Sequence, residues 1–242
     1  MRSYAIGDIH GHIELLRSAH DRIADDMARY GSAPVIHVGD LCDRGPDSRA
    51  VVDHLMNGIG AGQDWIVLKG NHDRMFHRFM RDPAELEPGL RPDLSWLHPR
   101  IGGAETLVSY GVFRPADRRA GQVHADALGL VPPEHLAFLD ACPTLHQRGE
   151  AAFVHAGIRP GVALAEQRET DLLWIREPFL MDPVSHGPLI VHGHTAIAAP
   201  RHYGNRVNID SSAAYGGPLT AVVIEGPDVF HLTEAGRVPL RP

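Results

Sequence analysis

The first third of the chain alternates short apolar runs with segments of helical periodicity. Residues 12–30 carry apolar side chains at helical spacing, and residues 48–56 show a shorter pattern of the same kind. Three apolar runs have the length of buried strands: residues 4–6, 35–38 and 65–68. The order strand, helix, strand, helix, strand predicts an α/β fold with βαβ units and a mostly parallel sheet.

The pattern changes beyond residue 81, where prolines interrupt any long element: Pro83, Pro88, Pro92 and Pro99. Helical spacing then returns in three segments: residues 101–110, 116–128 and 133–140. We interpret residues 76–142 as a largely helical insertion, a cap over the site, within one domain that spans residues 1–242.

Apolar runs return in the last part of the chain, and four of them predict strands: residues 151–154, 189–191, 207–209 and 219–224. We expect the last two to form a meander that closes a second sheet. No apolar run follows them of comparable strength, and residues 234–242 are expected to be a loose tail.

Composition narrows the function classes. The chain has 242 residues, 43% of them hydrophobic, and a formal net charge of −7, so stable nucleic-acid binding is not expected. No window approaches the ~20 apolar residues of a membrane span, and no signal-peptide core precedes Gly7. Cys42 and Cys142, the only cysteines, are expected to be reduced, buried thiols. We therefore expect a cytoplasmic protein without a membrane partner; the sequence leaves its oligomeric state open.

Polar side chains of the metal-binding kind follow five of the predicted strands, where ligands bind in α/β sheets. The candidate ligands are Asp8, His10, Asp40, Asn71, His155 and His194. Carboxylate, imidazole and amide donors without a thiolate suit Mn, Fe or Zn better than Ca or Mg. Six groups exceed the needs of one ion, whereas two ions about 3.5–4 Å apart with a shared carboxylate would use them all. Each motif alone could be a turn or a structural histidine; their joint occurrence favours a two-metal site.

The motifs resemble those of the serine/threonine phosphoprotein phosphatases in the calcineurin-like metallophosphoesterase superfamily, close to the phage-type and diadenosine tetraphosphatase-like branch. Gly-Asp-x-His-Gly stands at residues 7–11, Gly-Asp-x-x-Asp-Arg-Gly at 39–45 and Gly-Asn-His-Asp at 70–73. His-Ala-Gly at 155–157, Gly-His-Thr at 193–195 and the segment 172–177 match as well. Two departures occur: the third motif ends in Asp73 where the family has Glu, and Ser211-Ser212 follow Asp210 where the family often has Thr-Gly.

The resemblance implies a fold and a set of roles. The fold would be a four-layer β-sandwich flanked by helices. Asp8 and His10 would bind one ion, Asn71, His155 and His194 the other, and Asp40 both. His72 would be the general acid, oriented by Asp43. Arg44 and Arg176 would bind the phosphate.

Four functions follow from this reading; the fourth, a nucleic-acid phosphodiesterase, is disfavoured by the negative net charge. The first is a phosphoprotein phosphatase that cleaves phosphoserine and phosphothreonine by direct attack of a metal-bridging hydroxide, with two divalent ions, Mn²⁺ first and Fe or Zn as alternatives. The second is a hydrolase of diadenosine tetraphosphate or related dinucleotides. The third is a non-catalytic phosphate-binding module. The partner would be a phosphorylated protein or a small phosphate ester. Lys69 and Arg159 could contact phosphate or be ordinary surface cations.

Overall fold

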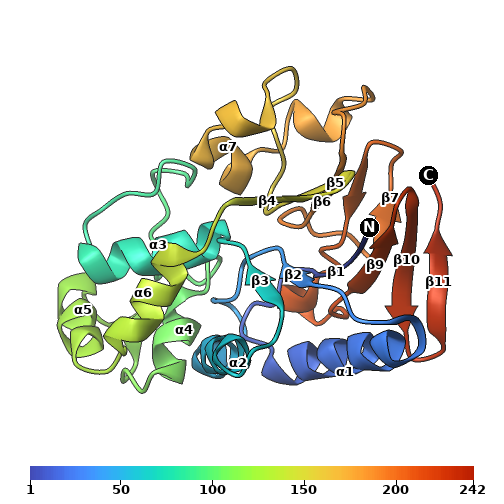
Figure 1. Ribbon diagram of the computed structural model, residues 1–242. Helices are drawn as coiled ribbons and strands as arrows, with labels where there is room; N and C mark the ends of the chain where they lie inside the picture. Colours follow the sequence, from blue (N-terminus) through green and yellow to red (C-terminus); the bar gives the residue numbers. More distant parts are fainter.

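The first of two central sheets contains the predicted N-terminal strands. The structure is a computed structural model that describes residues 1–242. β1 (Arg2–Ile6), β2 (Val35–His37) and β3 (Trp65–Val67) run parallel to one another, as predicted. The antiparallel strands β9 (Ala221–Glu225), β10 (Asp228–Thr233) and β11 (Gly236–Leu240) extend the sheet beside β1. The strand order is β11-β10-β9-β1-β2-β3 (Figure 1).

The second sheet has a parallel centre and antiparallel edges. Its order is β4 (Leu145–Arg148), β5 (Ala151–Val154), β6 (Leu189–His192), β8 (Arg206–Asn208) and β7 (Arg201–His202). The expected meander of residues 207–209 and 219–224 is therefore wrong, because β8 pairs with β6 in this sheet and β9 pairs with β1 in the other. β9 is apolar on both faces, which requires a covered, central position between two strands.

The C-terminal segment is ordered by pairing, so the expected loose tail is also wrong. β10 and β11 form an antiparallel hairpin in which Thr233 lies opposite Gly236. The Arg237 guanidinium binds both carboxylate oxygens of Asp26 at 2.7 Å and also contacts Glu225 at 3.0 Å. These bonds fix the hairpin to helix α1 (Ile13–Tyr30).

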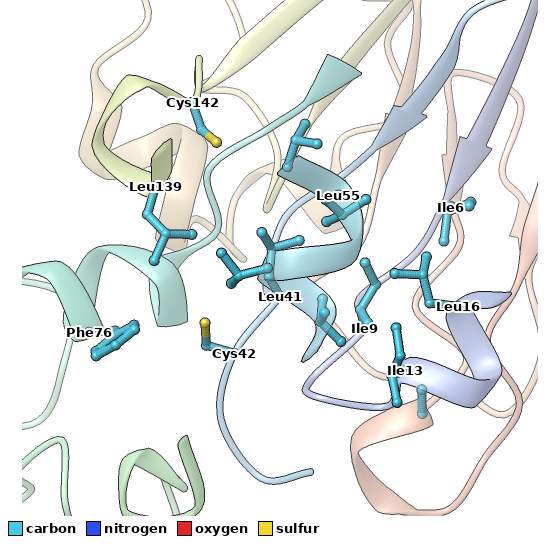
Figure 2. Close-up of a cluster of buried hydrophobic side chains, with 14 of the residues drawn as sticks. Ile6, Ile9, Ile13, Leu16, Leu41, Cys42, Leu55, Phe76, Leu139 and Cys142 are labelled. Atoms are coloured by element: carbon cyan, nitrogen blue, oxygen red, sulfur yellow. The ribbon is translucent and has the colours of Figure 1, made fainter. Parts of the chain in front are cut away.

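Helices cover the outer face of each sheet, which gives four layers in the order helix, sheet, sheet, helix. α1 and α2 (Ser48–Gly60) pack on the first sheet, where Ile6 of β1 meets Ile13 and Leu16 of α1 (Figure 2). A second apolar cluster, which includes Ile36, Phe153 and Val191, fills the space between the sheets. α7 (Glu169–Trp174) and the residues after it cover the second sheet. The expected α/β sandwich is confirmed.

Four further helices gather at one side of the molecule (Figure 1): α3 (Asn71–Arg81), α4 (Gly103–Ser109), α5 (Ala120–Leu128) and α6 (Pro133–Ala141). Three of them agree with the predicted helices, and residues 82–102 contain no helix or strand. α3 begins at Asn71, so the expected boundary near residue 76 falls inside a helix. That this region is an insertion in a single domain stays a prediction. Cys42 and Cys142 are free and buried, as expected, and none of the helices has the length and apolar character needed to cross a bilayer.

Candidate metal centre and phosphate-binding cavity

The candidate ligands come from the carboxyl ends of strands in both sheets. Asp8, Asp40 and Asn71 follow β1, β2 and β3 of the first sheet. His155 and His194 follow β5 and β6 of the second. From the sequence we expected all of these residues at the edge of a single sheet. In the structure the strands that precede them belong to two packed sheets, and the residues gather where the carboxyl ends of those strands meet.

Two groups of ligand-type atoms meet there and share one carboxylate. Ligand atoms of His10, Asp40 and His72 lie within 4.8 Å of one another, and so do those of Asp40, His155 and His194. Asp40 belongs to both groups, which is the position that a carboxylate shared by two ions would need. The first group contains His72, which the sequence assigned to acid catalysis, in place of Asp8.

Asp8 lies beside the second group and is hydrogen-bonded to one of its members, His194. Its Oδ2 atom accepts the backbone N–H of His194 at 2.9 Å, while its buried Oδ1 atom has no partner. Burial, Asp210 and Asp40 raise the pKa of Asp8 well above its usual range. A cation would stabilise this crowded carboxylate in its ionised form.

The proton positions on His155 provide a test of whether this site fits a metal ion. Burial lowers the pKa of His155 to about 4, so the ring is neutral and carries one proton at pH 7. Nδ1 lies 3.0 Å from the Val38 carbonyl oxygen and donates to it, which leaves a lone pair on Nε2. That lone pair lies 2.7 Å from Oδ1 of Asn71. Two acceptors this close repel each other unless a cation binds both, and Nε2 of His194 is also buried without a partner. The residues present therefore fit a divalent ion.

His10 repeats the arrangement on the other side of Asp40. Its Nδ1 atom lies 2.8 Å from the Cys42 carbonyl oxygen, and its Nε2 atom lies 3.4 Å from Oδ2 of Asp40. Histidine ligands of metals commonly donate their second N–H to a backbone carbonyl, which fixes the ring. His10 and His155 both meet this condition.

His72 and Asp43 form the buried pair that the sequence predicted. Nδ1 of His72 lies 2.6 Å from Oδ2 of Asp43, and Nε2 accepts an N–H of Arg44 at 3.0 Å. Burial lowers the pKa of His72 to about 3. The neutral ring therefore holds its proton on the Asp43 side, and Nε2 faces the site as an acceptor.

Two side chains that the sequence did not single out hold Asp43. Trp96 donates its indole N–H to Oδ2 at 2.8 Å, and Thr106 donates its hydroxyl to Oδ1 at 2.7 Å. Burial raises the pKa of Asp43 to about 7, and these donors favour the carboxylate. Neither residue belongs to a motif: Trp96 lies in the irregular segment of residues 82–102, and Thr106 lies in α4.

A cavity of about 640 Å³ opens over these groups. Arg44 and Arg176, the predicted phosphate ligands, line it together with His72 and the candidate ligands His10, Asp40, Asn71 and His194. Residues to which the sequence assigned no role complete the wall, among them Arg91, Arg100, Glu105, Trp174, Asp210 and Tyr215. Lys69 instead bonds the Asp140 carbonyl and Arg159 bonds Asp171, so neither lines the cavity.

Backbone strain concentrates at this site. Seven residues other than glycine have positive φ angles, and five of them are candidate site residues: His10, Asp40, Asp43, Arg44 and His194. Left-handed conformations of such residues cost of the order of 1 kcal/mol or more each and collect at functional sites. The fold thus holds these side chains in positions that their backbones disfavour.

The two departures from the family motifs have local structural explanations. Asp73 accepts the backbone N–H groups of Gly70 and Leu41 at 2.8 and 2.9 Å, so it ties α3 to the loop after β2. Ser212 has φ of 68°, the conformation that glycine favours, and its hydroxyl donates to the Ile197 carbonyl at 2.9 Å. Both departures leave the ligand positions in place.

Comparison with known proteins agrees with this geometry. A family model described as calcineurin-like phosphoesterase matches residues 1–223, which include every candidate site residue. The chain belongs to the calcineurin-like phosphoesterase family. It is accordingly a phosphoesterase hydrolase, and the family's fold implies divalent metal ions.

Curated relatives of this phosphoesterase cover most of its length. An asymmetrical bis(5'-nucleosyl)-tetraphosphatase PrpE of Anoxybacillus flavithermus is 26% identical, over 90% of this chain and 88% of the relative. A protein of the same name from Bacillus thuringiensis is 23% identical, over 92% and 90%.

Solved structures share the fold of this phosphoesterase. A putative diadenosine tetraphosphatase superposes with a TM-score of 0.66 at 20% identity, covering 99% of this chain and 94% of that one. A cold-active protein-tyrosine phosphatase of a psychrophilic Shewanella gives 0.59 at 18% identity, covering 99% and 80%. At such identities the likeness concerns the fold.

Proposed function

We propose that this phosphoesterase hydrolyses dinucleoside tetraphosphates asymmetrically, into a nucleoside triphosphate and a nucleoside monophosphate. The observation that carries the proposal is the cavity, whose about 640 Å³ extends from the metal-type cluster to two further arginines and the aromatic rings of Trp174 and Tyr215. A phosphomonoester needs only the cluster, Arg44 and Arg176. The names of the curated relatives support the same substrate class. We thus place the alternative function before phosphoprotein hydrolysis.

In this proposal the six candidate ligands hold two divalent ions. Asp8 and His10 would hold one, Asn71, His155 and His194 the other, and Asp40 both. Manganese is our first choice, with Fe and Zn as alternatives, because the donors are carboxylate, imidazole and amide. Bound ions would supply a nucleophile by lowering the pKa of water and would polarise the phosphoryl oxygens.

The remaining site residues act on the substrate itself. Arg44 and Arg176 bind the phosphoryl oxygens and neutralise charge that builds up during attack. One P–O bond of the bridging P–O–P group breaks, and its electron pair stays on the leaving phosphate oxygen. The oxygen of water bonds to the other phosphorus, and the proton that water loses passes to the solvent or to the leaving oxygen. A phosphate oxygen is a much weaker base than a serine alkoxide. Hydrolysis of the dinucleotide therefore depends less on proton donation by His72, whose Nε2 atom faces the site without a proton.

The second candidate function is hydrolysis of phosphoserine and phosphothreonine, and the His72–Asp43 pair favours it. An alkoxide leaving group needs a proton, and a carboxylate 2.6 Å from the ring stabilises the charged imidazole that would deliver it. A non-catalytic module has less support, because the acid, the arginines and the ligands are all present.

A substrate panel separates the candidates. We would reconstitute the protein with Mn²⁺ and measure kcat/KM for diadenosine tetraphosphate, a phosphoserine peptide and p-nitrophenyl phosphate, with chromatography of the nucleotide products. We expect the dinucleotide to be preferred and to give ATP and AMP. ADP as the only product would contradict asymmetrical cleavage, and a preferred phosphopeptide would favour the second candidate.

A further inference from the structure

The cavity wall carries a cation that the proposed catalytic groups do not use. Arg91 and Arg100 both lie in residues 82–102, the irregular segment between α3 and α4, and both line the cavity. Arg91 binds Asp93 through two bonds, of 2.9 and 2.7 Å, so its guanidinium already has a carboxylate partner. The Arg100 guanidinium has no hydrogen bond or ion pair with any other side chain or carbonyl.

The arginines of helix α3, in the same helical region, are engaged by carboxylates. Arg74 of α3 is bound by the buried Glu87, and Arg78 and Arg81 are bound by Glu85. Arg100 is therefore the guanidinium of this region that is free to bind an anion, and its planar group suits the oxygens of a phosphate.

The backbone beside Arg100 is fixed to the catalytic residues. The carbonyl of Gly102 accepts the backbone N–H of Arg44 at 3.1 Å, and Trp96 reaches Asp43 from the same segment. The Trp96 ring also stacks on Phe76, with ring centroids 5.3 Å apart. Arg100 thus starts from an anchored part of the segment, so its distance from Arg44 is restrained.

We propose that Arg100 forms a distal phosphate subsite, which binds a phosphate of the substrate one or more anhydride links away from the phosphorus that is attacked. This inference rests on the proposed function. A tetraphosphate chain keeps three phosphates outside the reacting centre, and each brings negative charge into the cavity. A phosphomonoester brings none, so Arg100 discriminates between the two substrate classes.

Kinetics of Arg100→Gln with two substrates test the subsite. We expect KM for diadenosine tetraphosphate to rise roughly 10- to 100-fold, as for loss of a charged hydrogen bond, while kcat/KM for p-nitrophenyl phosphate changes less than about twofold. Arg114→Gln is the matched control, since that exposed arginine binds Asp117 and does not line the cavity. Equal losses with both substrates would overturn the proposal.

Inhibition separates the subsite from the proposed function. Tripolyphosphate and orthophosphate would be tested against p-nitrophenyl phosphate hydrolysis with the free Mn²⁺ concentration held constant, and tripolyphosphate binding would also be measured by calorimetry. We expect Arg100→Gln to weaken tripolyphosphate about tenfold or more and to leave orthophosphate unchanged. If the protein cleaves no dinucleotide, the proposed function fails while this result still supports a polyphosphate subsite. Equal tripolyphosphate affinity in the variant and the wild type would refute the subsite.

Discussion

The cluster that joins α1 to the C-terminal hairpin and the strand-end cluster differ in how their polar atoms are satisfied. In the cluster that joins α1 to the C-terminal hairpin, Asp26 is bound by Arg237 and by the Tyr4 hydroxyl, so the protein supplies every partner of the carboxylate. In the strand-end cluster, Asp8 and His194 each keep a buried atom without a partner. The first cluster is complete as folded, whereas the second keeps the unpartnered atoms to which, in our proposal, a divalent ion would bind.

Asp40→Asn should give the largest effect, because it alters the strand-end cluster, which keeps buried atoms without protein partners. The amide can still accept the backbone N–H of His72, which Oδ1 of Asp40 now accepts at 3.0 Å, so the fold should persist. Loss of the shared charge should reduce the Mn²⁺ content and lower kcat/KM by more than ~100-fold. Loss of a residue that only supports a metal ligand already costs up to ~100-fold. Kinetics and elemental analysis measure both, and a fully metal-loaded, active variant would contradict the assignment of Asp40.

His72→Asn should come next, with an effect that depends on the leaving group. We expect a loss of about 10²–10⁴ in kcat for a phosphoserine peptide, the usual contribution of proton transfer, and a smaller loss for p-nitrophenyl phosphate. Metal content should match the wild type. Because His72 also lies in the first group of ligand-type atoms, loss of one metal equivalent would show that it is a ligand instead.

Asp26→Asn would break the complete cluster without touching the chemistry. Removing one charge of a buried pair costs about 3 kcal/mol in the free energy of unfolding, which urea denaturation measures. Activity per folded molecule should equal that of the wild type. Arg114→Gln, an exposed substitution, serves as the control for stability; an equal loss there would mean that burial of Asp26 is not the cause.

Trp96→Phe would sharpen the comparison at Asp43, because it removes one donor and keeps an aromatic ring. We expect kcat to fall roughly tenfold, as for other residues that orient a functional side chain, with the same melting temperature within a few degrees. Turnover equal to that of the wild type would show that Thr106 and His72 suffice to hold the carboxylate.

The acid dependence of stability should be the smallest effect. Burial raises the pKa of Asp26, but hydrogen bonds from Arg237 and Tyr4 outweigh it and hold the pKa below its ordinary value; Glu225 is shifted in the same direction. Their stabilisation is therefore present above pH ~4 and is lost as the pH falls through the lowered pKa values. As the pH is lowered from about 5 through the lowered pKa values, unfolding free energies should fall less steeply in Asp26→Asn than in the wild type.

The strand-end motifs could be found from the sequence because each is contiguous and follows its own apolar run. Asp8, Asp40, Asn71 and His155 each stand within a few residues of a strand, and the fold brings those ends together. Trp96 could not be found in this way: it reaches Asp43 across 53 residues from a segment without periodicity. Pairing across the chain is set by three-dimensional contacts that no local pattern records.

The C-terminal hairpin escaped prediction for a different physical reason. β11 contains Arg237 and Pro239, and its burial is only partial, so it lacks the apolar alternation of a typical strand. Its order derives from pairing with β10 and from the bond between Arg237 and Asp26. Charge pairing over 211 residues leaves no signature in a local window.

The left-handed backbone at the site has a consequence for the evolution of this chain. Glycine would relieve the strain at His10, Asp40, Asp43, Arg44 and His194. Selection for heat resistance alone would therefore favour glycine at positions where the chemistry forbids it. A descendant with glycine at several of these positions would be more stable but inactive. Such replacements would mark a lineage in which selection for catalysis had already ended.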